Sequence, residues 1–385
     1  MQNFTYHNPV KIVFGKGSIA ELPKLIPDDT EVLMLYGGGS IKRNGVYDQV
    51  ARAMQGRRLV EFGGIEPNPR YETCMKAVEL AQAEGINFLL AVGGGSVLDG
   101  TKFIAAAALY QGTDPWDMVA KRAGVSAGAL PIGCVLTLPA TGSEANGNAV
   151  ITREGTKEKL ALFSKSLFPR FSILDPEATF TLPPRQTANG IVDAFVHTTE
   201  QYLTYPVNSP LQDRQAEAVL LTLLEEAPKI MADPRNYEAQ ANLMWCATQA
   251  LNGLIGCGVP QDWATHMIGH ELTALYGIDH AQSLAVVLPG MLRHQKSRKR
   301  AKLLQYAERI WGPCDGDEDA RIERAIEKTE QFFHSLGVGT RFPDYQIPAE
   351  AVELVASRLA ARDIALGEHR DLEEKEVKEI LALQK

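Results

Sequence analysis

The sequence lacks the features of a membrane-bound, secreted or nucleic-acid-binding protein. None of its apolar runs approaches the ~20 residues that a transmembrane helix needs. Its first residues, MQNFTYHNPVKIVFG, lack the basic and then apolar order of a signal peptide. Basic residues are not in excess, because the net charge is −8, and no basic stripe is left to neutralise phosphate groups. We therefore expect no membrane partner and no nucleic-acid partner.

Cysteine is scarce, and its spacing forms no motif. The five cysteines are odd in number, widely spread and without a Cys-x-x-Cys pair, which argues against a disulfide framework and against cysteine metal ligands. Reduced thiols of this kind predict a cytoplasmic protein. The densest basic run, RHQKSRKRAK at residues 293–302, precedes a helical pattern, and we expect it on a solvated helix face.

The first half of the chain alternates short apolar runs with helical patterns. The apolar runs predict β-strands at residues 11–14, 31–36, 59–62, 87–92, 132–138 and 171–174. Helical patterns lie between them, at residues 71–84 and 97–109. This alternation indicates a Rossmann-like α/β fold, in which a parallel sheet carries helices on both faces.

The pattern changes after Leu182, because strand signals almost vanish beyond it. Long helical patterns follow at residues 185–203, 211–231, 237–255, 263–276, 283–294, 298–311 and 318–336. With 45% hydrophobic residues, the chain is long enough to build two cores. We therefore predict an α/β domain at residues 1–182 and an all-helical domain at residues 183–385.

The segment NFLLAVGGGSVLDGTK predicts a phosphate-binding turn. An apolar strand runs directly into Gly93, Gly94 and Gly95, and a helix begins near Ser96. Glycines let the backbone approach a pyrophosphate, and a helix N-terminus offers free N–H groups and a favourable dipole. The alternative is an ordinary tight turn. Three glycines cost backbone entropy that such a turn does not need, so we favour phosphate binding.

A second glycine loop, made of Gly37, Gly38, Gly39 and Ser40, bears on the choice of dinucleotide. In many dinucleotide sites a carboxylate after a strand holds the adenosine ribose. This loop has no carboxylate, and Lys42 and Arg43 follow it closely. Unless the loop is a plain glycine turn, we expect it to accept a 2′-phosphate, which favours NADP over NAD.

The polar loop TLPATGSEANGNAV follows the apolar run at residues 132–138. Its side chains suit the nicotinamide half of a dinucleotide, although the loop alone is weak evidence. The candidates are Thr137, Thr141, Ser143 and Asn146. Lys159, in TKEKLALFS, resembles an ordinary surface lysine when composition alone is considered.

The helical half contains a set of metal-ligand side chains. Asp193 and His197 lie four residues apart and therefore on one helix face. His266, His270 and His280 fall within fifteen residues of a mostly apolar segment, where each buried imidazole needs a partner. A lone histidine is more often a packing residue. The carboxylate of Asp193 and the three imidazoles of His197, His266 and His280, however, form a full donor set for zinc or ferrous iron.

Together these motifs resemble the iron-containing (group III) alcohol dehydrogenases. The matching segments run in order along nearly the whole chain: FGKGS, EPNP, GGGSVLDGTK, LPATGSE, DAFVHTTE and HMIGHELTALYGIDHAQSLAVVLP. Within that family, GGGS at Gly37 and VPQDWATH near Pro260 are most similar to the bacterial NADPH-dependent aldehyde reductases, also called butanol dehydrogenases.

The resemblance implies a fold and a reaction. It implies a Rossmann-like domain, a helical domain and a cleft between them, in a homodimer that meets near Val13. The reaction is hydride transfer between NADP(H) and a small aldehyde or primary alcohol. One divalent metal, zinc or iron, is expected to act as a Lewis acid on the substrate oxygen.

The resemblance also implies roles for residues. The metal ligands are Asp193, His197, His266 and His280. The residues expected around the cofactor phosphates and ribose are Gly93, Gly94, Gly95, Ser96 and Asp99, with Thr137, Thr141 and Ser143 beside the nicotinamide and Lys159 helping to hold the cofactor. Asn68, Leu138 and Leu182 complete the expected cofactor contacts, and His270 and Asp99 are the candidate catalytic residues.

Two other functions remain open from the sequence. A dehydroquinate-synthase-like lyase would share the architecture and recycle its NAD. It would bring basic residues for a phosphorylated substrate, which the mainly apolar ligand segments lack. A non-catalytic nucleotide-binding protein with a structural metal would close every metal position, whereas a catalytic site keeps one open.

We predict that His266→Ala abolishes metal binding and turnover while leaving the fold largely intact, because it removes one metal donor. Metal content after dialysis, the rate of turnover and the far-UV circular dichroism spectrum measure these three properties. Full activity in this variant would contradict the assignment of His266.

Overall fold

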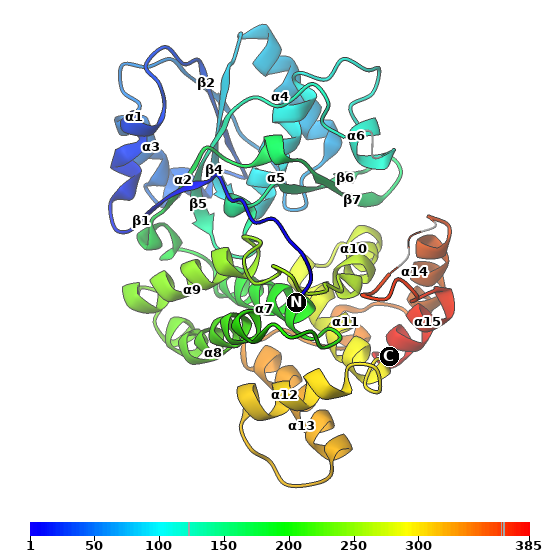
Figure 1. Cartoon of the computed structure of the whole chain (residues 1–385). Helices are drawn as coiled ribbons and strands as arrows, with labels where there is room; N and C mark the ends of the chain where they lie inside the picture. Colours follow the sequence, from blue (N-terminus) through cyan, green and yellow to red (C-terminus); the bar gives the residue numbers. More distant parts are fainter. Residues whose placement is uncertain (122–123, 363, 365) are drawn as a thin grey trace. The chain divides into compact units, whose positions relative to one another are not determined.

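The chain packs into two compact units (Figure 1). The computed structural model describes residues 1–121, 124–362, 364 and 366–385. The α/β unit consists of His7–Pro183 and Asp233–Thr248. The helical unit consists of Met1–Tyr6, Pro184–Ala232 and Gln249–Lys385. The main boundary between the units therefore falls between Pro183 and Pro184. Two short segments, Met1–Tyr6 and Asp233–Thr248, each belong to a different unit from the residues next to them in sequence.

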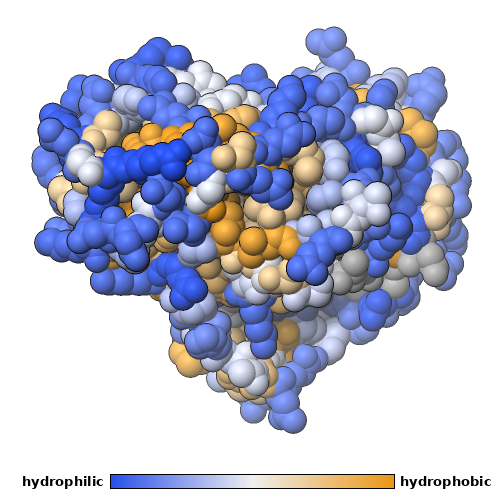
Figure 2. Space-filling model, turned by 90° about the horizontal axis from the view of Figure 1, so that it is seen from above, coloured by the Kyte–Doolittle hydropathy of each residue, from blue (hydrophilic) through white to orange (hydrophobic). Residues whose placement is uncertain are grey.

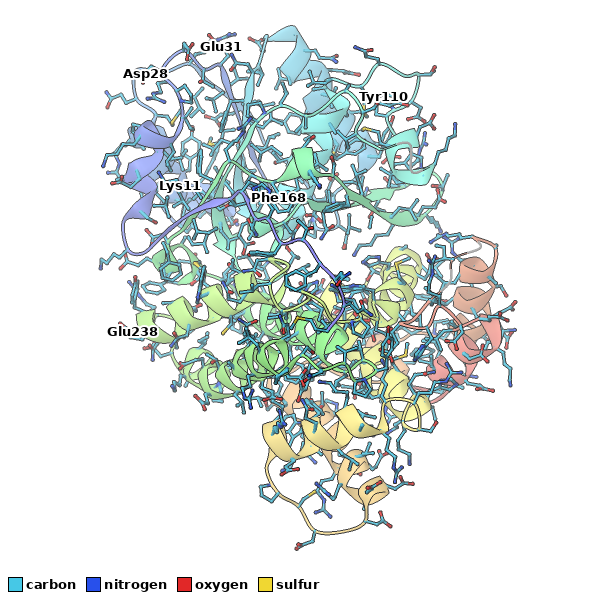
Figure 3. The ribbon with its side chains drawn as sticks, in the orientation of Figure 1. Lys11, Asp28, Glu31, Tyr110, Phe168 and Glu238 are labelled. Carbon is cyan, nitrogen blue, oxygen red and sulfur yellow. The ribbon has the colours of Figure 1, made fainter. Side chains whose placement is uncertain are left out.

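The α/β unit contains a parallel sheet, as the sequence predicts. Its strands are β1 (Lys11–Phe14), β2 (Val32–Tyr36), β3 (Leu59–Phe62), β4 (Phe88–Gly94), β5 (Ile132–Leu138) and β8 (Phe171–Leu174). Their order across the sheet is β1-β8-β5-β4-β2-β3, and every pairing is parallel. Figure 3 labels Lys11 at the start of β1, which pairs with Phe171 of β8.

Helices cover both faces of this sheet, which confirms the predicted fold class. Leu33 and Leu35 of β2 pack in one core with α4 (Tyr71–Ala83) and α5 (Gly95–Ala107). The alternate residues Val32 and Met34 pack in a second core. The helices of that core are α1 (Leu22–Leu25) and α3 (Val46–Ala53). Because successive strand residues face opposite ways, a strand buried on both faces needs an unbroken apolar run.

An antiparallel hairpin in the α/β unit was not predicted. It consists of β6 (Asn148–Arg153) and β7 (Glu158–Phe163). Its turn carries the charged stretch TREGTKEK, which has no strong strand signal. The shorter elements of the unit are α2 (Ser40–Arg43), α6 (Asp117–Ala120), η1 (Ser18–Glu21), η2 (Ser143–Ala145), η3 (Lys165–Leu167) and η4 (Pro176–Thr179).

The helical unit follows the predicted helices closely. Its elements are α7 (Pro184–Tyr202), α8 (Pro210–Ala232), α10 (Ala264–Tyr276), α11 (His280–His294), α12 (Arg300–Trp311), α13 (Glu318–Ser335), η5 (Phe342–Tyr345), α14 (Ala351–Ala360) and α15 (Glu374–Ala382). α9 (Tyr237–Ala250) lies mostly in the α/β unit. The sequence patterns did not predict α14 and α15. The predicted start of α11 was three residues too late. The helix begins at His280 because Asp279 caps it there.

The basic run at residues 293–302 is a solvated face only in part, and the prediction was wrong for Lys299 and Lys302, which are buried. Arg293 forms ion pairs with two glutamates of α13. The Lys299 side chain is only 3% exposed, and its Nζ lies 2.7 Å from a carboxylate oxygen of Asp262 and 2.9 Å from one of Glu368. The same Nζ donates to the carbonyl of Leu203 at 2.7 Å. Acidic groups from distant segments draw the run inward, and a local charge pattern cannot show this.

Within residues 1–121, 124–362, 364 and 366–385, no helix is long and apolar enough to cross a bilayer. Figure 2 shows one face of the molecule, on which hydrophilic residues surround smaller hydrophobic areas.

We predict that Lys299→Met lowers the free energy of unfolding by about 3–5 kcal/mol, because it leaves two buried carboxylates without their cation. Arg298→Met is the matched control. Arg298 pairs with a half-exposed Asp371, and such a pair contributes ~0–1 kcal/mol. Urea unfolding followed by circular dichroism measures both. An equally small loss of unfolding free energy in the two variants would show that the contacts of Lys299 with Asp262 and Glu368 add little to stability.

Candidate functional site

One face of α7 carries three of the functional side chains. Asp193, His197 and Glu200 follow one another at intervals of four and three residues, so they lie along one side of the helix. Pro184 begins α7, where its missing N–H costs nothing. The side chains of Asp193 and His197 are about 95% buried. A buried acidic face of this kind needs polar partners from other helices.

Those partners come from α10 and α11 of the same unit. His266 and His270 lie one turn apart near the start of α10, and His280 is the first residue of α11. The N-cap of α11, Asp279, is held by Arg185 and Asn189 of α7, which contact its Oδ2 at 2.7 Å and 2.6 Å. These two contacts tie the start of α11, and with it His280, to α7.

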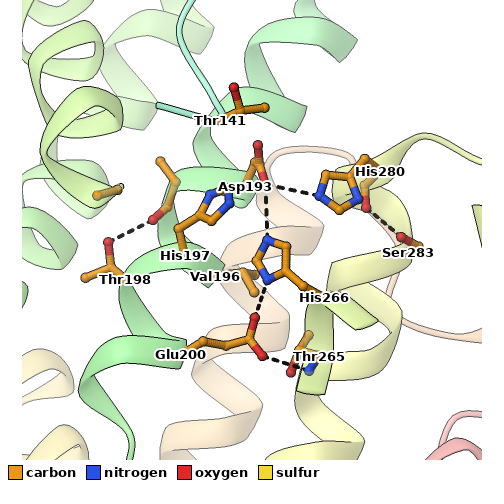
Figure 4. Close-up of polar contacts among 12 residues, drawn as sticks. Thr141, Asp193, Val196, His197, Thr198, Glu200, Thr265, His266, His280 and Ser283 are labelled. Atoms are coloured by element: carbon orange, nitrogen blue, oxygen red, sulfur yellow. Dashed lines mark hydrogen bonds and ion pairs between the residues drawn. The ribbon is translucent and has the colours of Figure 1, made fainter. Parts of the chain in front are cut away.

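The structure brings the predicted ligands around Asp193 (Figure 4). Its Oδ1 lies 3.3 Å from Nδ1 of His197 and 3.8 Å from Nε2 of both His266 and His280. Ligand atoms of Asp193, His266 and His280 all lie within 4.8 Å of one another. Donors bound to one tetrahedral ion are roughly 3.3–3.6 Å apart. The three side chains would therefore need to move only slightly to bind one ion. His197 is not one of these three residues, but its ring nitrogen contacts Asp193 and so lies next to the group.

The donor atoms of this cluster fit a divalent cation. Nε2 of His266 and Nδ1 of His197 are buried and have no hydrogen-bond partner among the residues that the structure describes. A buried ring nitrogen without a partner costs free energy, and a metal ion would satisfy both. His280 is the most exposed of the four side chains, at 21%, so solvent or a substrate has its best access there.

Electrostatics favour a cation in the same place. Burial disfavours a charged His266, but the carboxylates of Glu200 and Asp193 outweigh this and raise the pKa of His266 to about 9. Burial lowers the pKa of His197 to about 4, with only partial compensation from Asp193. His197 is therefore neutral at pH 7, as a metal ligand must be. The two carboxylates supply the negative field that attracts a metal.

Glu200 is a candidate functional residue that the sequence argument missed. Its Oε2 contacts Nδ1 of His266, and its Oε1 accepts the backbone N–H of Thr265 at 2.7 Å. The carboxylate can accept a hydrogen bond from Nδ1–H, which directs Nε2 of His266 toward Asp193, where a bound metal would replace the proton on Nε2. The spacing of seven residues from Asp193 places Glu200 on the ligand face of α7, and this signal was available in the sequence.

His270 lies beside the candidate ligands and outside the cluster around Asp193. Its ring centroid is 5.1 Å from that of His280 and 6.3 Å from that of His266. The side chain is buried. The role of His270 near the substrate stays a prediction.

In the α/β unit, the first predicted phosphate loop joins β4 to α5. A Cβ at Gly95 would lie 2.4 Å from Oγ1 of Thr141, and one at Gly94 would lie 2.9 Å from Cβ of Leu138. The glycine turn therefore packs directly on the loop after β5, and this packing alone demands glycine. It also brings together four residues expected at the cofactor, and it leaves the N–H groups of the first turn of α5 at the same edge.

Asn68, Ser96 and Lys159 meet beside this turn. The backbone N–H of Asn68 donates to Oγ of Ser96 at 3.2 Å, and Nζ of Lys159 donates to Oδ1 of Asn68 at 2.8 Å. Lys159 is buried, so the surface role suggested by composition was wrong. Three segments that are distant in sequence thus supply one polar group next to the glycine turn.

Asp99 holds the polar loop that follows β5. Its Oδ1 accepts from Oγ of Ser143 at 2.6 Å, and its Oδ2 accepts the backbone N–H of Val150 at 3.0 Å. Lys102, which sequence reasoning missed, donates to Ser143 at 2.8 Å and to Asn146 at 3.2 Å. Burial lowers the pKa of Lys102 to about 8. These contacts show Asp99 fixing a loop, and a direct catalytic role for it stays a prediction.

The remaining cofactor candidates lie at different places in the unit. The Gly37 carbonyl accepts the N–H of Gly64 at 3.0 Å, and a Cβ at Gly37 would lie 3.6 Å from Val97 of α5. The second glycine loop is therefore next to the first. Thr137 is buried in β5. Leu182 donates its N–H to Thr179 within its own turn.

Family models match both halves of the chain. The model described as iron-containing alcohol dehydrogenase matches residues 9–176. The model described as the C-terminal part of the Fe-containing alcohol dehydrogenase family matches residues 187–384.

Individual relatives extend over nearly the full length. The NADPH-dependent aldehyde reductase YqhD of Escherichia coli is 56% identical over 374 residues, which cover 97% of each chain. A probable NADH-dependent butanol dehydrogenase 1 of Bacillus subtilis is 45% identical and covers 99% of each chain. The crystal structure of Escherichia coli YqhD has a TM-score of 0.98 at 54% identity, covering 100% of this chain and 99% of that one.

We predict that Glu200→Gln weakens metal binding about 10–100-fold, the usual effect of removing a carboxylate behind a histidine ligand. Competition with a chelator measures the affinity without reference to activity. Glu225→Gln on α8 is the control, because Glu225 is exposed. Unchanged affinity in Glu200→Gln would show that this carboxylate does not prepare His266.

Proposed function

Because the chain belongs to the iron-containing alcohol dehydrogenase family, we propose that it reduces small aldehydes to primary alcohols with NADPH and catalyses the reverse oxidation. The observation that carries this proposal is the cluster of the buried Asp193 and His266 with the partly exposed His280 in the helical unit, whose ligand atoms lie within 4.8 Å of one another. The same chain carries glycine turns at the carboxyl ends of two parallel strands, where dinucleotides bind in such sheets.

We propose Asp193, His197, His266 and His280 as the residues that hold one divalent metal, zinc or iron. When bound, the metal supplies a Lewis acid for the substrate oxygen, and the dinucleotide supplies or accepts the hydride. The donor set of three imidazoles and one carboxylate suits both metals.

The protein side chains orient these groups and manage the proton. Glu200 fixes the Nδ1 proton of His266, so Nε2 is the coordinating atom. Asp279 caps α11 and thereby sets the position of His280. His270 stands next to His280, and we assign it the exchange of the alcohol proton at a ring nitrogen. Burial of Asp193 and His197 keeps water from competing for the charges of the cluster.

The proposed preference for NADP(H) rests on the loop at Gly37, Gly38, Gly39 and Ser40. Gly39 has a φ of 84°, a left-handed conformation that favours glycine. The loop itself carries no acidic side chain. The relatives differ in this property, since the Escherichia coli reductase is named for NADPH and the Bacillus subtilis relative for NADH. The higher identity to the former supports NADPH.

We also propose a cytoplasmic homodimer. All five cysteines are free thiols, and four of them are buried, which suits a reducing compartment. β1 lies at one edge of the sheet, so its outer side is available for the contact expected near Val13. Size-exclusion chromatography with light scattering measures the number of subunits.

The decisive experiment compares NADPH and NADH oxidation with butyraldehyde, using metal-stripped protein with and without added zinc or iron. We expect turnover that requires metal and is faster with NADPH, because the cluster lacks its cation after stripping. Faster turnover with NADH would overturn only the cofactor preference. No turnover in metal-loaded protein with either cofactor would overturn the proposed reaction.

A further inference from the structure

A carboxylate from outside the second glycine loop pairs with Lys42, which lies in the short helix α2 that begins at Ser40 of that loop. β3 pairs with β2 in parallel register, with Glu61 beside Met34. The Glu61 carboxylate lies 3.4 Å from the hydroxyl of Tyr36, the last residue of β2, and 3.3 Å from Nζ of Lys42. An acidic group is therefore present beside α2, and it comes from the neighbouring strand β3 rather than from the loop.

Lys42 covers this carboxylate. Its Nζ pairs with Glu61 and also lies 5.0 Å and 4.7 Å from the ring centroids of Tyr36 and Tyr47. The hydroxyl of Tyr47 donates to the other oxygen of Glu61. Contacts with Tyr36 and Glu61 raise the pKa of Lys42. Partial burial of Glu61 is outweighed by its bonds to Tyr47 and Lys42, which lower the pKa of Glu61. Both groups are therefore charged at neutral pH.

The exposure of this ion pair limits its contribution to stability. The side chains of Lys42 and Glu61 are 46% and 33% exposed, and ion pairs this accessible contribute little to folding. Two aromatic rings nevertheless hold the ammonium over the carboxylate. Lys42 is thus held in place at the surface although its ion pair adds little stability. We infer that its position serves the binding of a ligand.

The pair lies where the adenosine ribose is expected. The loop at Gly37 adjoins Val97 in the first turn of α5, and β2 is the neighbour of β4 in the sheet. In parallel α/β sheets the pyrophosphate lies at the helix after one strand, and the ribose lies at the end of the neighbouring strand. A 2′-phosphate bound at the Gly37–Ser40 loop would therefore meet the charges of Lys42 and Glu61.

We propose that Lys42 is a specificity-determining residue that neutralises Glu61 and so admits the 2′-phosphate of NADP(H), an inference that rests on the proposed function. Without Lys42, the Glu61 carboxylate repels the phosphate and remains able to accept a hydrogen bond from the 2′-hydroxyl of NAD(H). Cofactor preference in this chain then depends on a pair of charges from α2 and β3 as well as on the glycine loop.

The test measures the Kd of NADPH and of NADH by nucleotide fluorescence, with the full-length protein at low and at physiological salt. Lys42→Met is expected to raise the Kd of NADPH about tenfold at low salt, where the uncovered carboxylate repels the phosphate most strongly. The Kd of NADH is expected to stay within about twofold. Glu61→Gln alone is expected to keep the NADPH preference.

The double variant Lys42→Met/Glu61→Gln separates neutralisation from a direct contact with the phosphate. If Lys42 acts by covering Glu61, the double variant recovers the wild-type Kd of NADPH within about threefold. Arg43→Met is the matched control, because it removes the same charge from the next position of α2, and Arg43 forms no ion pair with Glu61 in the described part of the chain. Its Kd is expected to change less than threefold.

Three results would overturn the inference. They are an unchanged Kd of NADPH in Lys42→Met, a double variant as weak as Lys42→Met, and an equal loss in Arg43→Met. In each case a wild-type protein that binds NADPH would leave the proposed function standing. A wild-type protein that binds neither dinucleotide would instead overturn the proposed function, and this inference with it.

Discussion

The burial of two carboxylates on one face of α7 is the constraint that organises the helical unit. Asp193 and Glu200 are both nearly inaccessible to solvent, and ionised carboxylates are costly to bury without partners. Their partners are the rings of histidines on α7, α10 and α11. Each helix must therefore dock in one register, and that register is the one that gathers nitrogen donors around a single oxygen of Asp193.

The α/β unit depends on a different constraint, the close approach of backbone segments at the carboxyl end of the sheet. Gly94 and Gly95 have no room for a side chain because Leu138 and Thr141 of the neighbouring loop occupy it. Asp99 and Lys102 then hold that neighbouring loop through Ser143. Packing and polar contacts thus fix the edge where the proposed cofactor phosphates would bind, so the glycines serve the fold as well as the proposed cofactor site.

Sequence patterns predicted the parts of the molecule that depend on local periodicity. The six parallel strands were predicted within two residues at each end, because strands buried on both faces need unbroken apolar runs. The hairpin of β6 and β7 was missed because its charged turn hides the alternation. The start of α11 was missed because a single capping residue, Asp279, determines it. The candidate metal ligands were predicted from residue type and spacing, and the family comparison agrees with the reaction class.

The sequence by itself determined the fold class, the reaction class implied by its family and the candidate ligands, since these follow from residue types at short spacings. Only the tertiary structure decided which charges meet. Glu200 contacts His266, Lys299 is buried against two carboxylates, and Lys42 pairs with Glu61. Two of these contacts join residues more than thirty positions apart, and all three arise where one element packs against another. A charge in the sequence has no partner until the fold supplies one, because electrostatic energy depends on distance and burial rather than on chain order.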